Sequence, residues 1–182
     1  TKTHAPDILC LQETKTEDAH FPLEALKQMG FDYCIYRGQK SYNGVAILYR
    51  LPITKHESMQ SLDDGSARHI SVSIDQTPII LHNMSMPAGG DEPDPKINPK
   101  FKSKLTFLDE ITRWSASVKN AHTIMVGDFN IAPLEHDVWS HKQLLKVVSH
   151  TPIEVEKLSA LQQAGGWIDS AREFVPHDEK SY

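Results

Sequence analysis

Short apolar runs separated by polar, turn-forming segments dominate the first half of the chain. Five of them have the length and composition of strands, at residues 7–11, 31–36 (FDYCIY), 44–49 (GVAILY), 69–74 (HISVSI) and 77–83 (TPIILHN). Segments rich in turn residues, such as RGQKSYN and SIDQT, lie between them. This succession of strands over short connections predicts a β-rich centre with antiparallel meander pairing.

Helical spacing appears early and late in the chain. Apolar residues at 101, 105, 108, 111 and 118 predict an amphipathic helix over 101–118. Another helix is expected from Thr151, where Pro152 takes the first helical position and Glu154 completes a capping box, with a stop at Gly165-Gly166. A shorter helix is expected over 22–29, before Gly30.

Helices at both ends with strands between them predict an α/β fold in which helices cover a pair of sheets. The stretch 86–100, with four prolines and two glycines, is expected to form a long irregular loop. No repeat or linker divides the sequence, so residues 1–182 are predicted to form one domain. A chain of 182 residues that is 39% hydrophobic is large enough for a sizeable core.

Two of the predicted strands run into carboxylates. Glu13 follows the first strand, and the apolar run 124–126, interpreted as covered on both faces, leads through Gly127 to Asp128 and Asn130. Carboxylate and amide oxygens suit a hard cation such as Mg²⁺, which polarises a phosphoryl oxygen while a neighbouring carboxylate orients a water. An ordinary Asp-Asn turn explains Asp128 and Asn130 equally well on spacing alone.

Composition and charge exclude some classes of protein and of site but do not assign a function. The net charge of −5 does not indicate nucleic-acid binding, although a bound divalent cation reverses the local field of an acidic protein. Cys10 and Cys34 lie in apolar runs and are predicted to be small core residues, and the ten histidines show no zinc-binding spacing. No apolar stretch is long enough to cross a bilayer, so a cytoplasmic location is expected.

Five segments together indicate a family. PDILCLQETK, GQKSYNGVAIL, DGSARHISV, HNMSMPAGG and IMVGDFNIAP stand in the order and approximate spacing of the exonuclease III family, within the endonuclease/exonuclease/phosphatase superfamily, which the chain resembles over nearly its whole length. The resemblance implies a four-layer α/β/β/α sandwich of the DNase I-like kind. It also implies a monomeric DNA-repair nuclease that hydrolyses double-stranded DNA at abasic sites and 3′ ends with Mg²⁺, or with Mn²⁺ in its place.

The resemblance also implies roles for individual residues. Glu13 matches the family's metal-binding glutamate, and Asp128 and Asn130 match the GDxN residues that serve the metal, the nucleophile and the scissile phosphate. Residues expected to approach DNA are Arg68, Gln39, Lys40 and Asn43. A surface ion pair for Arg68 and a plain solvated loop for the others remain open. Lysines 96, 100, 102 and 104 fit either phosphate contacts or a solvated helix start.

The chain departs from the family in two respects. Ser85 stands where the family has a catalytic tyrosine, so a hydroxyl is kept at shorter reach. The family's opening asparagine strand and its closing tryptophan-rich, RIDH-like and SDH segments are missing from the sequence, so the sandwich is expected to be incomplete at both termini and the chain to be the central part of a longer enzyme. A phosphodiesterase or phosphatase acting on a small substrate, and a non-catalytic remnant that binds DNA or a partner, remain alternatives.

Overall fold

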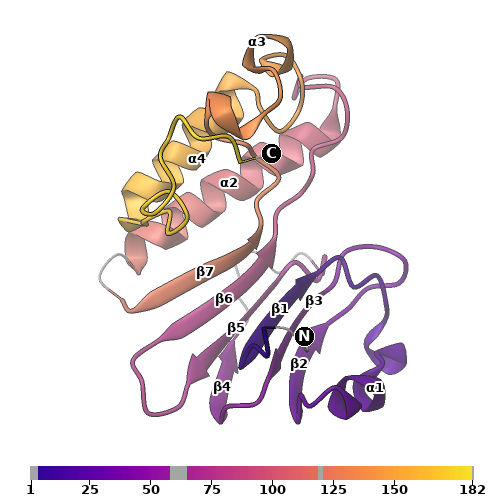
Figure 1. Cartoon of the computed structure of the whole chain (residues 1–182). Coiled ribbons are helices and arrows are strands. Elements are labelled where there is room, and N and C mark those ends of the chain that lie inside the picture. The colour runs from indigo at the N-terminus through magenta and orange to yellow at the C-terminus, as the bar shows by residue number, and fades with distance from the viewer. Residues whose placement is uncertain (1–3, 58–64, 119–120, 182) are drawn as a thin grey trace. The chain divides into compact units, whose positions relative to one another are not determined.

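The computed structural model describes residues 4–57, 65–118 and 121–181, without the side chains of 54–57. The chain forms two compact units, of which unit 1 comprises Thr1–Met86 and Ala121–Phe129 and unit 2 comprises Pro87–Asn120 and Asn130–Tyr182 (Figure 1). In the part of the chain that is described, no helix is long and apolar enough to cross a membrane.

Unit 1 contains two sheets. The first has the order β1-β3-β2, from β1 (Ile8–Gln12), β2 (Tyr33–Arg37) and β3 (Val45–Tyr49), with antiparallel pairing throughout. The second has the order β4-β5-β6-β7, from β4 (Ile53–Glu57), β5 (His69–Ile74), β6 (Ile80–Ser85) and β7 (Thr123–Asp128). The predicted antiparallel meander is found in β4-β5-β6, whereas β7 joins β6 in parallel.

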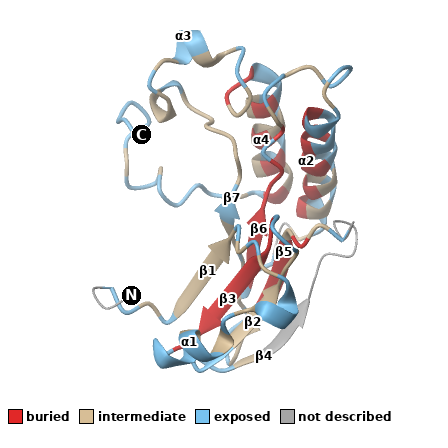
Figure 2. Ribbon diagram, turned by 90° about the vertical axis from the view of Figure 1, so that its right-hand side faces the viewer, coloured by how far each residue is buried: buried red, intermediate tan, exposed pale blue. Residues whose placement is uncertain are grey.

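Strand β3 is buried along its whole length (Figure 2), as a strand that is covered on both faces of its sheet would be. On one face Ala46 and Leu48 pack with Phe31, against partly buried residues that include Leu26 of helix α1 (Leu23–Gln28). The interpretation of residues 124–126 as a strand covered on both faces is wrong, because Ile124 is 46% exposed and Met125 and Val126 are only partly buried.

Unit 2 contains two long helices, α2 (Pro99–Ser117) and α4 (Pro152–Gly165). Two short elements, η3 (Glu135–Asp137) and α3 (His141–Leu144), lie between β7 and α4 in the sequence. Asn98 caps α2 through its side chain, and Thr151 and Glu154 form the predicted capping box of α4. Gly166, with φ +66°, ends α4 in the left-handed conformation that glycine adopts without strain. Unit 1 has one further short helix, η1 (Asp18–His20).

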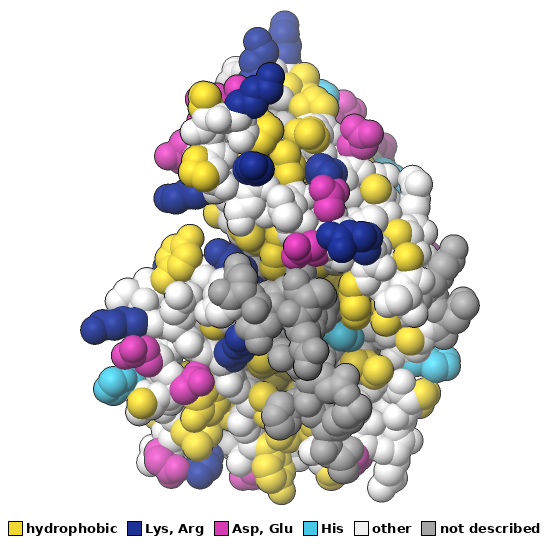
Figure 3. All heavy atoms as spheres, turned by 180° about the vertical axis from the view of Figure 1, so that it is seen from behind, with side chains coloured by type: hydrophobic (Ala, Val, Ile, Leu, Met, Phe, Trp, Pro, Cys, Tyr) yellow, Lys and Arg dark blue, Asp and Glu magenta, His cyan; other side chains and the backbone are white. Residues whose placement is uncertain are grey.

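Charged side chains of both signs are scattered over the face drawn in Figure 3, among hydrophobic and neutral ones. The predicted role of the lysine run is wrong for one member. Lys104 is fully buried and pairs with Glu154, whereas Lys96, Lys100 and Lys102 are exposed. A buried ammonium needs a carboxylate beside it, so Lys104 serves the interior of unit 2 and not a phosphate backbone.

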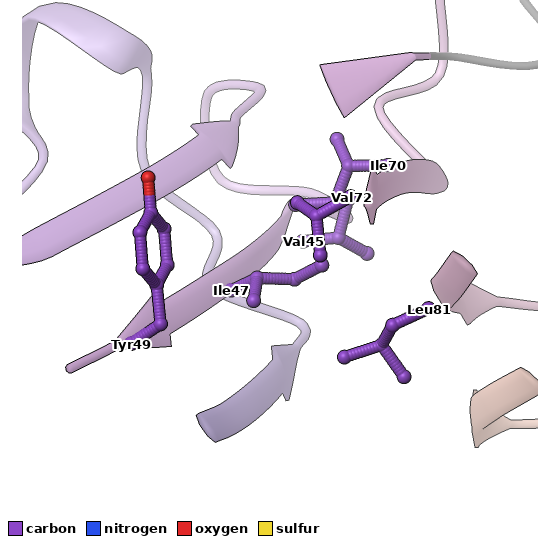
Figure 4. Close-up of a cluster of buried hydrophobic side chains, with 6 residues drawn as sticks. All are labelled: Val45, Ile47, Tyr49, Ile70, Val72 and Leu81. Atoms are coloured by element: carbon purple, nitrogen blue, oxygen red, sulfur yellow. The ribbon is translucent and has the colours of Figure 1, made fainter. Parts of the chain in front are cut away.

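The core of unit 1 lies between its two sheets. Alternate residues of β3 point to one side, where Val45, Ile47 and Tyr49 meet Ile70, Val72 and Leu81 of the second sheet (Figure 4). Burying each aliphatic side chain of this kind stabilises the fold by about 1.5–3 kcal/mol. This cluster fixes the separation and register of the sheets whose ends carry the predicted site residues.

Candidate functional site

Glu13 stands directly after β1 in an unusual backbone conformation. Its φ of +54° is left-handed, which costs a non-glycine residue about 1–2 kcal/mol. The side chain is exposed, and its Oε2 lies 3.4 Å from Lys15 Nζ, which is also exposed. The chain therefore turns out of the sheet at Glu13, the predicted metal ligand. Strained backbone conformations of this kind are common at functional sites.

Hydrogen bonds between three segments hold this turn. The backbone N–H of Lys15 donates to Asn43 O at 2.8 Å, and Gly44 N–H donates to Ala67 O at 3.2 Å. Asn43 is buried, and its Nδ2 donates to Gln39 Oε1 at 3.1 Å and to Ser66 O at 2.8 Å. Asn43, predicted to approach DNA, thus uses its amide to fix the loop.

The loop also presents residues to solvent. Lys40 and Tyr42 are exposed, and Gln39 is half-buried. Arg68 lies beside this loop, with its guanidinium carbon 5.8 Å from the Tyr42 ring centroid. The Arg68 Nη1 donates to Ser85 O at 3.1 Å, and Arg68 O accepts from Ser85 N–H at 2.8 Å. A basic group and an aromatic group therefore lie side by side here, the combination that proteins use to contact phosphates and to stack on bases.

Asp128 is the exposed last residue of β7 and pairs with Ser85 of β6. Its backbone oxygen accepts from Met86 N–H at 2.8 Å, so the strand end is tied to β6. Gly127 has φ +144°, and a Cβ there would lie 1.8 Å from Met84 O. The glycine of the GDFN sequence is thus required because β6 approaches closely at this point, next to the Asp128 carboxylate.

Ser85 does not reach solvent. It is 1% exposed, and its hydroxyl has no hydrogen-bond partner among the described residues. A catalytic role for Ser85 therefore stays a prediction that requires the hydroxyl to become accessible when substrate binds.

Asn130 follows two residues after Asp128 and belongs to unit 2. Its φ is +51°, and its backbone oxygen accepts from the buried Lys104 Nζ at 2.7 Å. Asparagine tolerates this left-handed conformation better than most residues, so the turn interpretation of the Asp-Asn segment and its predicted chemistry are compatible.

The sequence reasoning missed the amide network behind Glu13. Gln12 Nε2 donates to Oδ1 of the fully buried Asn83 at 2.6 Å. A signal was present, because Asn83 is a polar residue at the end of the apolar run TPIILHN and needs partners if that run is buried.

Carboxylate oxygens are the donors that a hard divalent cation prefers, and Glu13 and Asp128 are both exposed. Among the described residues, no group of three or more His, Cys, Asp or Glu side chains gathers as a metal site. Magnesium is usually bound by one or two carboxylates, with water or phosphate oxygens completing its ligands.

Comparison with known proteins places this geometry in a family. Residues 1–176 match the Endonuclease/Exonuclease/phosphatase family. A DNA-(apurinic or apyrimidinic site) endonuclease of Dictyostelium discoideum is 28% identical over 97% of this chain and 48% of its own length. Exodeoxyribonuclease III of Haemophilus influenzae is 26% identical over 74% of this chain and 51% of its own. The chain thus spans about half the length of the curated relatives it matches.

Solved structures agree in fold. A 3′-5′ exonuclease, NExo, of Neisseria meningitidis superposes with a TM-score of 0.86 at 30% identity, over 98% of this chain and 68% of that one. A structure of the Neisseria 3′ phosphatase NExo bound to a product DNA hairpin gives a TM-score of 0.85 at 29% identity, over 96% and 66%. The α/β fold class predicted from the sequence is confirmed. On the family match over nearly its whole length, this chain belongs to the endonuclease/exonuclease/phosphatase family.

Proposed function

We propose that this chain carries the phosphodiester-hydrolysing site of a DNA-repair nuclease of the exonuclease III type, which acts on double-stranded DNA at abasic sites and 3′ ends. The observation that carries the proposal is the pair of exposed carboxylates, Glu13 and Asp128, each at the end of a strand of unit 1. The names of the similar proteins, AP endonuclease and exodeoxyribonuclease III, supply the substrate class.

Each residue has a separate role in this proposal. Glu13 holds a divalent cation, and Mg²⁺ bound there would supply Lewis-acid polarisation of the phosphoryl oxygen. Asp128 orients the attacking water and accepts its proton, and the amide of Asn130 donates to the phosphate. Arg68, Lys40 and Gln39 contact the DNA backbone, where phosphate contacts set register and orientation.

Incision of a duplex with a single abasic site tests the proposal, with Mg²⁺ and with a chelator. We expect incision to need the cation and to fall by about 100-fold or more in Asp128→Ala and in Glu13→Ala, because such groups act on the transition state. The control is Asp109→Ala, which removes an exposed carboxylate from α2. Undiminished incision by Asp128→Ala would contradict the assignment. Salt-dependent DNA binding by a folded chain without any hydrolysis would favour the non-catalytic alternative.

Removal of a 3′ phosphate is a second activity for the same site. The similar Neisseria structure is that of a 3′ phosphatase bound to product DNA, which favours it specifically. Comparing a duplex that ends in a 3′ phosphate with p-nitrophenyl phosphate distinguishes a DNA 3′ phosphatase from a small-molecule phosphatase. Release of phosphate from the duplex alone supports a DNA substrate, and release from both at similar rates supports a small-molecule enzyme.

A further inference from the structure

Asn83 of β6 joins the two sheets of unit 1 through its side chain. The residue is 0% exposed. Its Nδ2 donates to Leu11 O at 3.0 Å and to Ala46 O at 2.9 Å, and its Oδ1 accepts from Gln12 Nε2 at 2.6 Å. One residue of the second sheet thus contacts both β1 and β3 of the first.

The chemistry of these partners fixes the orientation of the amide. Backbone carbonyls only accept hydrogen bonds, so the atom that faces Leu11 O and Ala46 O must be the nitrogen. The oxygen then faces Gln12, which presents its own amide nitrogen. The network is directional, and neither an apolar residue nor a carboxylate at position 83 can reproduce it.

The position of the network matters as much as its bonds. In the neighbouring core, hydrophobic side chains already join the two sheets. Two of the three bonds go to Leu11 and Gln12, the last two residues before Glu13. The network therefore fixes the end of β1 and not the middle of the sheet.

The same stretch of β6 also fixes the end of β7. Asn83 pairs with Val126, and Ser85 pairs with Asp128, in parallel register. Residues two apart along a strand are separated by about 7 Å. Three consecutive residues of β6 therefore hold both the end of β1 and the end of β7.

We propose that Asn83 and Gln12 are positioning residues that set the direction in which Glu13 leaves β1 and so hold its carboxylate for the cation. This inference rests on the proposed function. Neither residue is assigned contact with the cation. They act through the backbone of Glu13, whose strained φ of +54° persists only if the surrounding structure holds it.

The test uses Mn²⁺ alone as the probe, with binding followed by electron paramagnetic resonance of the 182-residue chain. Gln12→Met keeps the length of the side chain, removes only the bond to Asn83 and leaves the two bonds from Asn83 to backbone oxygens. Asn83→Leu removes the whole network at similar volume. The control Val72→Ala weakens the core between the sheets without touching Gln12 or Asn83. Glu13→Gln removes the proposed metal ligand and so tests whether Mn²⁺ binds at Glu13.

We expect Gln12→Met and Asn83→Leu to weaken Mn²⁺ binding by about 10-fold, as loss of residues behind a metal ligand commonly does. The Mg²⁺ concentration for half-maximal incision should rise by a similar factor, with a smaller change in the maximal rate. Val72→Ala should lower the free energy of unfolding and leave Mn²⁺ affinity unchanged. If Asn83→Leu does not fold, Gln12→Met still decides the question.

Two outcomes overturn the inference in different ways. Wild-type affinity for Mn²⁺ in Gln12→Met, with binding abolished in Glu13→Gln, would leave the proposed function standing and reduce the network to fold stabilisation. No difference between the wild type and Glu13→Gln in Mn²⁺ binding would remove the metal site, and the proposed function would fall with it.

Discussion

Lys104 and Glu154 form an ion pair in which neither side chain is exposed. Lys104 Nζ lies 2.5 Å from Glu154 Oε1 and also donates to the backbone oxygens of Ala88 and Asn130 at 3.2 and 2.7 Å. Glu154 in turn accepts from Thr151 Oγ1 at 2.6 Å at the start of α4. The pair therefore links α2, α4 and the asparagine of the GDFN sequence.

Lys104→Met should lower the free energy of unfolding by about 3–5 kcal/mol, because it leaves the Glu154 carboxylate buried without its counter-charge. Lys104→Met/Glu154→Leu should recover part of that loss, since both charges are then removed. Urea unfolding followed by circular dichroism measures both. The matched control is Lys102→Met, an exposed position on the same helix, which should change little. Equal stability of Lys104→Met and Lys102→Met would show that the pair contributes nothing.

Gly127→Ala should destabilise unit 1 and displace Asp128. The added Cβ would lie 1.8 Å from Met84 O, a backbone atom that cannot move aside without breaking the β6–β7 pairing. We expect a loss of more than about 1 kcal/mol, beyond the strain of an alanine at positive φ. Gly65→Ala separates the two causes, because Gly65 has φ +81° and nothing within 4 Å of an added Cβ. Similar losses in both variants would rule out the clash as the cause.

Asp137 should make the stability of unit 2 depend on pH below about 4. Burial raises the pKa of this carboxyl, but hydrogen bonds from Ser181, Leu134 N–H and Arg172, together with the Arg172 charge, outweigh it and hold the pKa below its usual value of 3.8. Because the folded state favours the ionised form, the contribution is present above the unfolded pKa and is lost as the pH falls through the folded one.

Thermal unfolding is measured between about pH 2.5 and 6, a range that includes the usual carboxyl pKa. The melting temperature of Asp137→Asn should fall less steeply with decreasing pH than that of the wild type. Asp109→Asn is the control, since Asp109 pairs with Lys157 at an exposed position where an ion pair contributes about 1 kcal/mol or less. An unchanged acid profile in Asp137→Asn would show that its hydrogen bonds do not favour the ionised form.

Glu13→Gly should separate stability from function. Glycine adopts φ +54° without the cost that a glutamate bears there, so the free energy of unfolding should stay within about 1 kcal/mol of the wild type or rise. The same change removes the carboxylate, so cation-dependent incision should be lost. Chemical unfolding and the abasic-site assay on one preparation measure both. A large loss of stability would mean that the Glu13 side chain, paired with Lys15, supports the turn.

Local patterns in the sequence predicted most of the fold. The strands at 33–37, 45–49, 69–74 and 80–85 and the helices at 99–117 and 152–165 lie where periodicity and capping residues indicated them. β4 was missed, because LPITKHE carries a proline and charged residues that reduce its strand signal. The parallel pairing of β7 with β6 could not be predicted from local pattern, since it joins segments about forty residues apart.

The candidate site was harder to predict from the sequence. Glu13 and Asp128 were found because they follow apolar runs, but the left-handed turn at Glu13 is held by hydrogen bonds from residues 14 and 15 to residues 44 and 43. Lys104 looked like one of four surface lysines, and only the packing of α2 with α4 shows that it is buried. Burial of a single polar residue depends on tertiary contacts, which hydrophobic periodicity does not report.

His69 and His82 should make unit 1 sensitive to mild acid. The two rings are buried on adjacent strands, with His69 Nε2 3.0 Å from His82 Nδ1. Burial, then His82 and then Arg37 lower the pKa of His69 from 6.5 to about 3. Because the folded state favours the neutral ring, the stability it contributes is complete above about pH 6.5 and is lost as the pH falls from there toward 3.

His69→Gln should flatten this dependence, because glutamine can form hydrogen bonds but does not titrate. Urea unfolding at intervals from about pH 7 to 4.5 measures this dependence. The range includes the usual histidine pKa and lies above the pH at which Asp137 is expected to titrate. His20→Gln, at an exposed position, is the control and should follow the wild type. A wild-type profile that is flat over this range would show that His69 takes up a proton without cost.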